Sequence, residues 1–370
     1  LSPNFAMTFY IIILSIFICL SCISVYKKDA KWIKYAFSFC VILLIIHDGL
    51  RWETGTDWDL YKVQYRAEAQ PIFEFGYNLI NTTFFKLGVP YSLFILFIAV
   101  LCWSFYGMGI YKLSPLPILT LFIFYCSCVG YLGMNRQHIA LCLCLFSLTF
   151  VVKRQIIPFA ICILTACLFH QTAILFSVTY FLTKEIKHKY IFGVLFATIF
   201  INALDIPMQL LNGLRNFEFM PSKILFRLDR YTALLSTEDF PIIGSIIGIC
   251  RRMVIFIPLL ILKDELKNKY PNFTLFFNIY CISLGVFFLF NNCFQLFVSR
   301  ANLYFDLLSV PFLITSFVLY FEEKWKKALI VCAITLYSIL IFNKQISVHR
   351  DLFVPYKSLY YNQDFKRKMY

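Results

Sequence analysis

One loop in the first quarter of the sequence combines an arginine, three carboxylates and aromatic rings. It reads Arg51-Trp-Glu-Thr-Gly-Thr-Asp-Trp-Asp-Leu-Tyr61, so Glu53, Asp57 and Asp59 lie between or beside two tryptophans. Sugar-binding sites use aromatic faces to stack on C–H groups and carboxylates to accept from hydroxyls. On spacing alone, two interpretations are equally well supported. The loop is either a carbohydrate site or an ordinary solvated loop with an aromatic belt at the membrane interface.

Two further polar residues lie at the ends of apolar stretches. Arg136 begins one stretch, and a single arginine at such a boundary is more often a snorkelling anchor than a binding group. His170 lies between two short apolar runs. An ionisable side chain at membrane depth is costly and therefore indicates a function, with a structural histidine at a helix break as the alternative.

Other arginines interrupt the second half of the chain. Arg251 and Arg252 fall near the middle of the apolar segment 242–262. A charge there costs at least roughly 2.5–3.5 kcal/mol, so at least one of the two must face a polar cavity or partner. Arg230 lies in a long polar loop, and Arg300 ends a polar break just before Tyr304.

Lysine and arginine are also distributed unequally along the chain. The short polar runs that we assign to the cytosol, which are the four loops given below with Lys112 and Lys153-Arg154, hold 15 lysines and one arginine. Outside those runs and the last 27 residues there are three lysines but nine arginines. Membrane topology needs only positive charge, whereas bidentate binding of phosphate or carboxylate selects arginine. We therefore expect the outer half to hold an anion, with Arg51, Arg136 and Arg300 converging on one outward-facing cavity.

Composition predicts a membrane protein. Apolar residues make up 60% and charged residues 15% of the chain, and the mean hydropathy is +0.74; a soluble domain carries about 25% charge. Apolar stretches near the length of about 20 residues that crosses a bilayer recur from end to end. This predicts one all-α, polytopic domain over residues 1–370. The net charge of +14 then reflects cytosolic lysines and the basic tail rather than a nucleic-acid partner.

About twelve transmembrane helices are expected. They cover 8–26, 35–50, 90–111, 117–133, 137–152, two short helices within 156–183, 190–210, 242–262, 273–296, 301–320 and 328–343. The outer loops are about 51–89 and 211–240, the cytosolic loops are 27–34, 184–189, 263–269 and 322–327, and the tail 344–370 lies outside. Within the first outer loop, residues 72–88 carry Glu74 and predict an amphipathic or re-entrant helix.

Residues 156–183 decide the topology of everything that follows them. Basic clusters at both ends of this segment favour a hairpin of two short helices with His170 at its outer tip. A single tilted helix would invert every later assignment.

Four motifs in order resemble a known family. They are Arg51-x-x-x-Gly-Thr-Asp57-x-x-x-Tyr61, Glu74-Phe-Gly-Tyr77, Arg136-Gln-x-Ile-Ala140 and Phe169-His170-x-x-Ala173, with Arg300-x-x-x-Tyr304-Phe305 as a weaker downstream echo. Each motif is weak alone, but together they resemble the EpsG-like branch of Wzy-type polysaccharide polymerases over roughly residues 45–185. Apart from Arg300-x-x-x-Tyr304-Phe305, the second half, including Arg251 and Arg252, matches no motif of that family.

The resemblance implies a bacterial inner-membrane protein with a fold similar to the GT-C glycosyltransferases. Such proteins polymerise undecaprenyl-pyrophosphate-linked oligosaccharide units on the periplasmic side, with a chain-length regulator as a candidate partner. Arginines would neutralise the departing pyrophosphate without a metal ion. The substrate-binding candidates are Arg51, Arg136, Arg230, Arg251, Arg252, Arg300, Tyr61 and Tyr304. His170, Asp57 and Glu74 are candidates for the base, the first two ranked ahead of the third, and the sequence does not decide between His170 and Asp57.

Other activities stay open. An O-antigen ligase would use the same donor with another acceptor, and a lipid-linked oligosaccharide flippase would also need many spans and a cationic cavity. A sugar acyltransferase would use a histidine, but His170 is not followed by an H-x-x-x-D pattern. The sequence contains no nucleotide-phosphate loop and no zinc-ligand spacing, so we expect neither ATP coupling nor a metal or other cofactor.

Overall fold

The computed structural model describes residues 7–66, 73–215, 242–291 and 300–366. These residues are helical apart from turns, short links and a single isolated β-bridge between Arg51 and Ser358. The helices form two compact units, one of residues 1–180 with 314–370 and one of residues 181–313.

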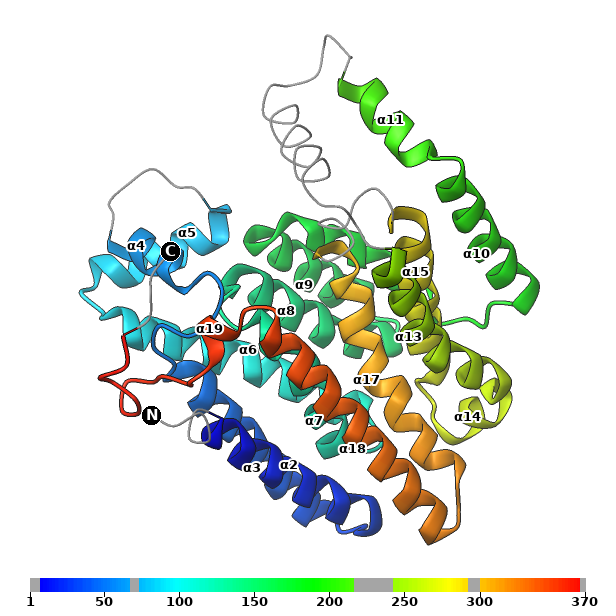
Figure 1. The fold of residues 1–370 in the computed structure, drawn as a ribbon, viewed down its shortest axis with the longest axis horizontal. Coiled ribbons are helices and arrows are strands. Elements are labelled where there is room, and N and C mark those ends of the chain that lie inside the picture. The colour runs from blue at the N-terminus through cyan, green and yellow to red at the C-terminus, as the bar shows by residue number, and fades with distance from the viewer. Residues whose placement is uncertain (1–6, 67–72, 216–241, 292–299, 367–370) are drawn as a thin grey trace. The chain divides into compact units, whose positions relative to one another are not determined.

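The first unit contains most of the long helices (Figure 1). They are α2 (Thr8–Tyr26), α3 (Ala30–Gly49), α4 (Trp58–Arg66), α5 (Phe75–Lys86), α6 (Tyr91–Leu113), α7 (Pro117–Cys128), the short 3-10 helix η1 (Val129–Tyr131), α8 (Asn135–Val152), α9 (Ile156–Phe169), the 3-10 helix η2 (Gln171–Phe181), α18 (Lys324–Ser347) and α19 (Arg350–Phe353).

Helices α7 and α8 form the centre of this unit. Helix α8 packs on α6 and α9, while α7 packs on α2 and α18. Every residue of α7 except Ser127 is buried, which suits a helix without any charged side chain. Helices α2, α3 and α9 instead expose apolar side chains, among them Ile11, Phe39 and Ile157, as expected of surfaces that face lipid.

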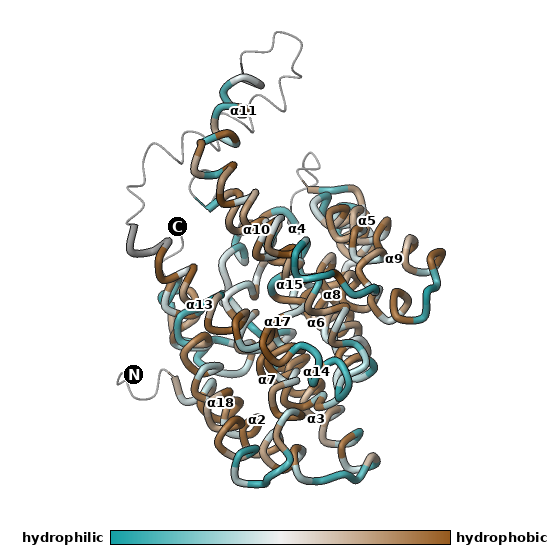
Figure 2. Tube along the Cα trace, turned by 90° about the vertical axis from the view of Figure 1, so that its right-hand side faces the viewer, coloured by the Kyte–Doolittle hydropathy of each residue, from teal (hydrophilic) through white to brown (hydrophobic). Residues whose placement is uncertain are grey.

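The second unit contains α10 (His188–Ala203), α11 (Ile206–Arg215), α13 (Ile242–Ile261), α14 (Lys263–Lys269) and α15 (Phe273–Phe290), and α17 (Leu303–Tyr320) contributes to both units. Helix α10 packs on α15. In both units hydrophobic residues follow the long helices and hydrophilic residues gather at turns and short segments (Figure 2).

Seven helices among the described residues are long and apolar enough to cross a membrane: α2, α3, α6, α8, α15, α17 and α18. Three shorter apolar helices cover Pro117–Tyr131, Ile156–Phe169 and His188–Ala203. A multi-pass membrane protein is therefore confirmed, but a count of about twelve spans is not. The sequence count relied on apolar length, whereas several apolar segments form helices shorter than the roughly 20 residues that cross a bilayer.

The hairpin predicted for residues 156–183 is confirmed. Helix α9 ends at Phe169, and after His170 the chain returns along η2. The Arg154 Nη1 group donates to the Tyr180 carbonyl at 3.0 Å, and the Tyr180 hydroxyl donates to the Arg154 carbonyl at 3.0 Å. The two ends of the segment therefore lie together, as a single tilted helix would not allow.

In the first unit, the lysines of the predicted cytosolic turns lie at the opposite end from Arg51 and Arg136. The lysine end holds the α2–α3 turn, the last turn of α6 and the start of α18, where the Tyr26 hydroxyl donates to the Lys324 carbonyl and Lys112 lies over the Phe146 ring. The arginine end holds the end of α3 and the start of α8, with Arg51 and Arg136. The segregation read from the sequence is thus a spatial one within this unit.

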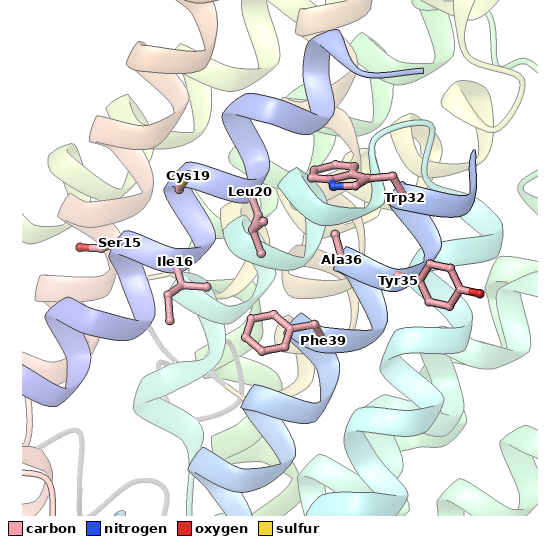
Figure 3. A pocket seen from close by; sticks show the side chains of 8 residues that line it. All are labelled: Ser15, Ile16, Cys19, Leu20, Trp32, Tyr35, Ala36 and Phe39. Carbon is pink, nitrogen blue, oxygen red and sulfur yellow. The ribbon is translucent and has the colours of Figure 1, made fainter. Parts of the chain in front are cut away.

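A shallow groove between α2 and α3 is lined by Ser15, Ile16, Cys19, Leu20, Trp32, Tyr35, Ala36 and Phe39 (Figure 3). The lining contains no aspartate, glutamate, lysine or arginine. The groove therefore suits hydrocarbon rather than a charged substrate. A site for a charged substrate is expected at the arginine end of the unit.

Candidate functional site

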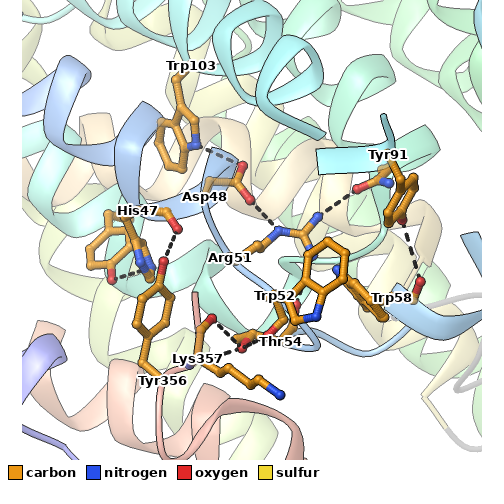
Figure 4. A network of polar contacts seen from close by, with 12 residues as sticks. His47, Asp48, Arg51, Trp52, Thr54, Trp58, Tyr91, Trp103, Tyr356 and Lys357 are labelled. Carbon is orange, nitrogen blue, oxygen red and sulfur yellow. Dashed lines mark hydrogen bonds and ion pairs between the residues drawn. The ribbon is translucent and has the colours of Figure 1, made fainter. Parts of the chain in front are cut away.

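A buried ion pair anchors the arginine end. Arg51 follows α3 by two residues and is only 3% exposed. Its Nε donates to Asp48 Oδ1 at 2.8 Å, and Trp103 Nε1 donates to Asp48 Oδ2 at 3.0 Å (Figure 4). The remaining contacts of the guanidinium run to the Thr54 carbonyl at 2.8 Å and to Asn135 Oδ1 at 2.9 Å. Arg51 is thus held by three partners inside the chain.

Two glycines bring the first and third motifs together. Gly55 and Gly133 have φ of +111° and +110°, a backbone conformation that disfavours other residues. A Cβ at Gly55 would lie 2.3 Å from the Leu132 carbonyl oxygen, and one at Gly133 would lie 2.9 Å from the Thr56 nitrogen. Neither site can hold a larger side chain without moving backbone. The loop before α4 and the turn before α8 can therefore approach within backbone contact.

The C-terminal segment completes this end of the unit. The Lys357 carbonyl accepts from the Trp52 nitrogen at 2.9 Å and from Thr54 Oγ1 at 3.1 Å. The Lys357 ammonium donates to Glu53 Oε2 at 2.6 Å, with the two side chains 7% and 14% exposed. The Tyr356 hydroxyl donates to the His47 carbonyl at 2.6 Å (Figure 4). Residues set aside as a basic tail are therefore part of the scaffold of the site.

Arg136, unlike Arg51, is partly open to the surroundings. Its Nε donates to the Tyr61 hydroxyl at 3.0 Å, its Nη1 forms an ion pair with Glu74, and its guanidinium lies 4.5 Å from the centre of the Phe73 ring. The Arg136 and Glu74 side chains are 27% and 17% exposed. This is a guanidinium held in place on three sides and still reachable.

Tyrosines complete the second cluster. Tyr61 is almost fully buried, and burial raises the pKa of its phenol although the nearby Arg136 charge acts the other way. Tyr61 therefore stays neutral at physiological pH and gives Arg136 a hydrogen bond but no counter-charge. The Tyr77 hydroxyl accepts from Asn135 Nδ2 at 3.3 Å, which links this cluster to Arg51 through Asn135.

The other two candidates for the base lie at the same end. His170 is half-buried after α9, with Nδ1 3.2 Å from Thr172 Oγ1. A Cβ on Gly76 would lie 2.9 Å from the Leu168 carbonyl oxygen, so the start of α5 packs on the end of α9. Asp57 is half-buried before α4, and its carbonyl accepts from the Tyr61 nitrogen at 3.1 Å. The four resembling motifs therefore meet in space.

The second unit has an arginine cluster of its own. Arg251 Nη2 lies 4.0 Å from Asp306 Oδ2, and Ser283 Oγ lies 3.3 Å from Asp306 Oδ1. The Arg252 guanidinium lies 3.6 Å from the centre of the Phe287 ring and donates to the Gly248 carbonyl at 3.1 Å. An acidic partner and an aromatic ring thus face the two arginines, in agreement with the need for polar partners in an apolar segment.

The remaining candidates are placed differently. Arg300 is exposed and Tyr304 is fully buried, both in the second unit, and Arg230 falls outside the described residues. Of the three arginines expected to converge, Arg51 and Arg136 lie together at one end of the first unit. The convergence of Arg300 on them stays a prediction.

Sequence reasoning missed several residues that the structure makes central. Asp48 lies inside an apolar segment, Asn135 was overlooked beside Arg136, and Lys357 belongs to the segment set aside as a tail. A signal existed for the first one, because a carboxylate three residues before an arginine at a helix end is well placed to pair with it. Nothing in the local sequence connects Lys357 to Glu53.

Fold and site together define a multi-pass helical membrane protein with a partly exposed arginine–carboxylate site at one end of its helices. The chain belongs to the EpsG family, whose model matches residues 34–358, from the first turns of α3 to the C-terminal segment. This is a Wzy-like, glycosyltransferase-like polymerase family of polysaccharide biosynthesis. No individual curated protein and no solved structure shows a significant match to the chain.

Proposed function

We propose that this protein polymerises oligosaccharide repeat units linked to undecaprenyl pyrophosphate, by metal-independent glycosyl transfer on the periplasmic side of a bacterial inner membrane. The observation that carries the proposal is Arg136, a guanidinium fixed by Tyr61 and Phe73 but 27% exposed. Such a group can bind phosphate oxygens in a fork, because its orientation is set before the substrate arrives.

The reaction needs little besides charge neutralisation and a base. The bond between the anomeric carbon of the donor sugar and the pyrophosphate oxygen breaks, and the pyrophosphate leaves with the electron pair. A hydroxyl of the acceptor unit forms the new bond and gives up its proton to His170, Asp57 or Glu74. Arg136 stabilises the negative charge that develops on the leaving group.

The arginines have different parts in this proposal. Arg51 has its guanidinium contacts inside the chain, so it positions Asn135 and thereby Arg136 instead of touching phosphate. Arg251 and Arg252 are the proposed substrate-binding groups of the second unit, together with Arg230, Arg300 and Tyr304. Tyr61 orients Arg136 from the buried side.

The lysine end is the proposed cytosolic side, since short cytosolic loops carry an excess of lysine and arginine. The arginine end then faces the periplasm, where polymerised glycan must appear. Helices α4 and α5 lie at this end and expose the apolar side chains Leu60, Val63, Phe75 and Leu79, which suits helices in the membrane interface.

The deciding experiment is the glycan profile of a deletion strain. Loss of a polymerase leaves surface glycan of a single repeat, and complementation with the wild-type gene restores long chains. Absence of any attached glycan would instead indicate a ligase. Repeat units trapped on the inner leaflet would indicate a flippase, and unchanged chain length with loss of an acyl group would indicate an acyltransferase.

A further inference from the structure

Glu74 carries the counter-charge of Arg136 at the candidate site. Among the described residues, the Arg136 guanidinium pairs with the Glu74 carboxylate and donates to the Tyr61 hydroxyl, which is a neutral phenol. Nε is held by Tyr61 and Nη1 by Glu74, so a pyrophosphate that binds Arg136 in a fork through Nη1 and Nη2 must compete with Glu74. Because the pair is partly exposed, a doubly charged ligand can reach the guanidinium and compete with the singly charged carboxylate.

Within the described part of the chain, the Glu74 side chain pairs with Arg136 and does not cap its own helix. Glu74 is the N-cap residue of α5, but its side chain accepts no hydrogen bond from the first turn of that helix. The start of α5 is instead fixed by Gly76, which packs against the Leu168 backbone, and by Tyr77, which is buried beside Tyr61 with ring centres 5.1 Å apart. The carboxylate can therefore leave Arg136 while the helix stays in place.

We propose that binding of the donor pyrophosphate to Arg136 displaces the Glu74 carboxylate, which then acts as the base that takes the proton of the acceptor hydroxyl. This deepens the proposed function and rests on it. Before the donor binds, the Glu74 carboxylate oxygen Oε2 is held in the ion pair with Arg136. After the exchange the carboxylate lies beside the reacting sugar with its charge uncompensated. The same contact thus suppresses the base in the absence of donor and releases it in its presence.

The step is balanced without a further reactant. The acceptor oxygen forms the new bond to the anomeric carbon, the bond to the pyrophosphate oxygen breaks, and the acceptor proton moves to Glu74. The pyrophosphate keeps the electron pair and is held by Arg136. When the carrier leaves, Glu74 gives its proton to water and pairs with Arg136 again.

The test measures carrier binding and polymerisation in the same variant. Glu74→Gln keeps the size of the side chain and removes its charge. The full-length protein in nanodiscs is titrated with undecaprenyl pyrophosphate, and glycan chain length per unit of inserted protein is measured in a complemented deletion strain. Because Gln no longer competes, we expect binding about two- to fivefold tighter. Because a base is missing, we expect turnover about 10²- to 10⁴-fold lower.

Two variants serve as controls. Glu323→Gln makes the same substitution in an exposed pair with Lys326 at the lysine end and should change neither quantity. Glu74→Asp keeps the carboxylate and should recover part of the turnover, which a merely structural side chain would not predict.

Three results would overturn the inference. Tighter binding with normal polymerisation of Glu74→Gln would make Glu74 a counter-ion only. Weaker binding together with lost polymerisation would make Glu74 a residue that positions Arg136. Failure of the wild-type protein to bind undecaprenyl pyrophosphate would refute the proposed function itself, and the inference with it. This outcome can be told apart from the other two because it is seen in the wild-type protein, before any variant is compared.

Discussion

Arg51 donates from Nη2 to Asn135 Oδ1 at 2.9 Å, and this one hydrogen bond joins the end of α3 to the residue just before Arg136. The two residues are 84 positions apart in the sequence. Asn135 also donates to the Tyr77 hydroxyl, so its side chain is fixed from two sides. The buried Arg51 network therefore determines where the first turn of α8 places the Arg136 guanidinium.

The first prediction concerns the energetic coupling of Asp48 and Arg51. Arg51→Gln should destabilise the protein by about 3–5 kcal/mol, because it leaves the buried Asp48 carboxylate without its cation. The double variant Arg51→Gln/Asp48→Asn should lose less unfolding free energy than the two single variants lose in total. Thermal unfolding in detergent, followed by tryptophan fluorescence, measures the four proteins of this cycle. Strict additivity would show that the two side chains do not act as a pair.

The second prediction compares two cations on α8 and its flank. Arg136→Lys should lose most polymerisation, since an ammonium cannot keep the fork to phosphate together with the Tyr61 contact. Lys153→Arg should lose none, because it exchanges one exposed cation for another at the lysine end. Glycan chain length in complemented cells, normalised to inserted protein, is the measurement. Equal tolerance of both changes would make Arg136 a membrane anchor.

The third prediction separates His170 from Glu74. With Glu74 as the base, His170→Ala should keep activity per inserted protein within about tenfold of wild type, below the loss that removal of a general base causes. The amount of inserted protein should fall, because His170 ends α9 and turns the chain into η2. A loss per inserted protein as large as that of Glu74→Gln would instead assign the base to His170.

The fourth prediction uses two glycines with positive φ. Gly55→Ala should prevent assembly of the arginine end, because the added Cβ would lie 2.3 Å from the Leu132 carbonyl oxygen. Gly88→Ala is its control, since Gly88 also has positive φ (+70°) but nothing within 4 Å of an added Cβ. The control should cost only the backbone strain of about 1–2 kcal/mol. Similar yields of the two inserted variants would contradict the close approach of the two loops.

The fifth prediction tests the C-terminal segment. Lys357→Met should destabilise the protein by about 3–5 kcal/mol, because it leaves the mostly buried Glu53 side chain without its ion-pair partner. Lys326→Met breaks an exposed pair with Glu323 and should cost less than about 1 kcal/mol. Protease resistance of the inserted proteins reports both. If the two variants resist proteolysis equally, the C-terminal segment does not hold the loop before α4.

The sequence alone determined the class of protein and most of its helices. Long apolar runs cannot leave backbone groups unpaired in lipid, so each such run had to form a helix, and the lysine-rich turns had to gather on one side. The hairpin at His170 followed from the same charges. The four motifs also identified the family, because their residues recur in order along the chain.

Only the tertiary structure decided which residues of those motifs touch. Arg51 and Arg136 read alike in sequence, yet one is buried in contacts with Asp48, Thr54 and Asn135, and the other is left partly exposed beside Glu74. Lys357 pairs with Glu53 across 304 positions. Local sequence encodes helices through hydrogen bonds that reach four residues, but a site built from the ends of several helices depends on packing between segments far apart, which no local pattern specifies.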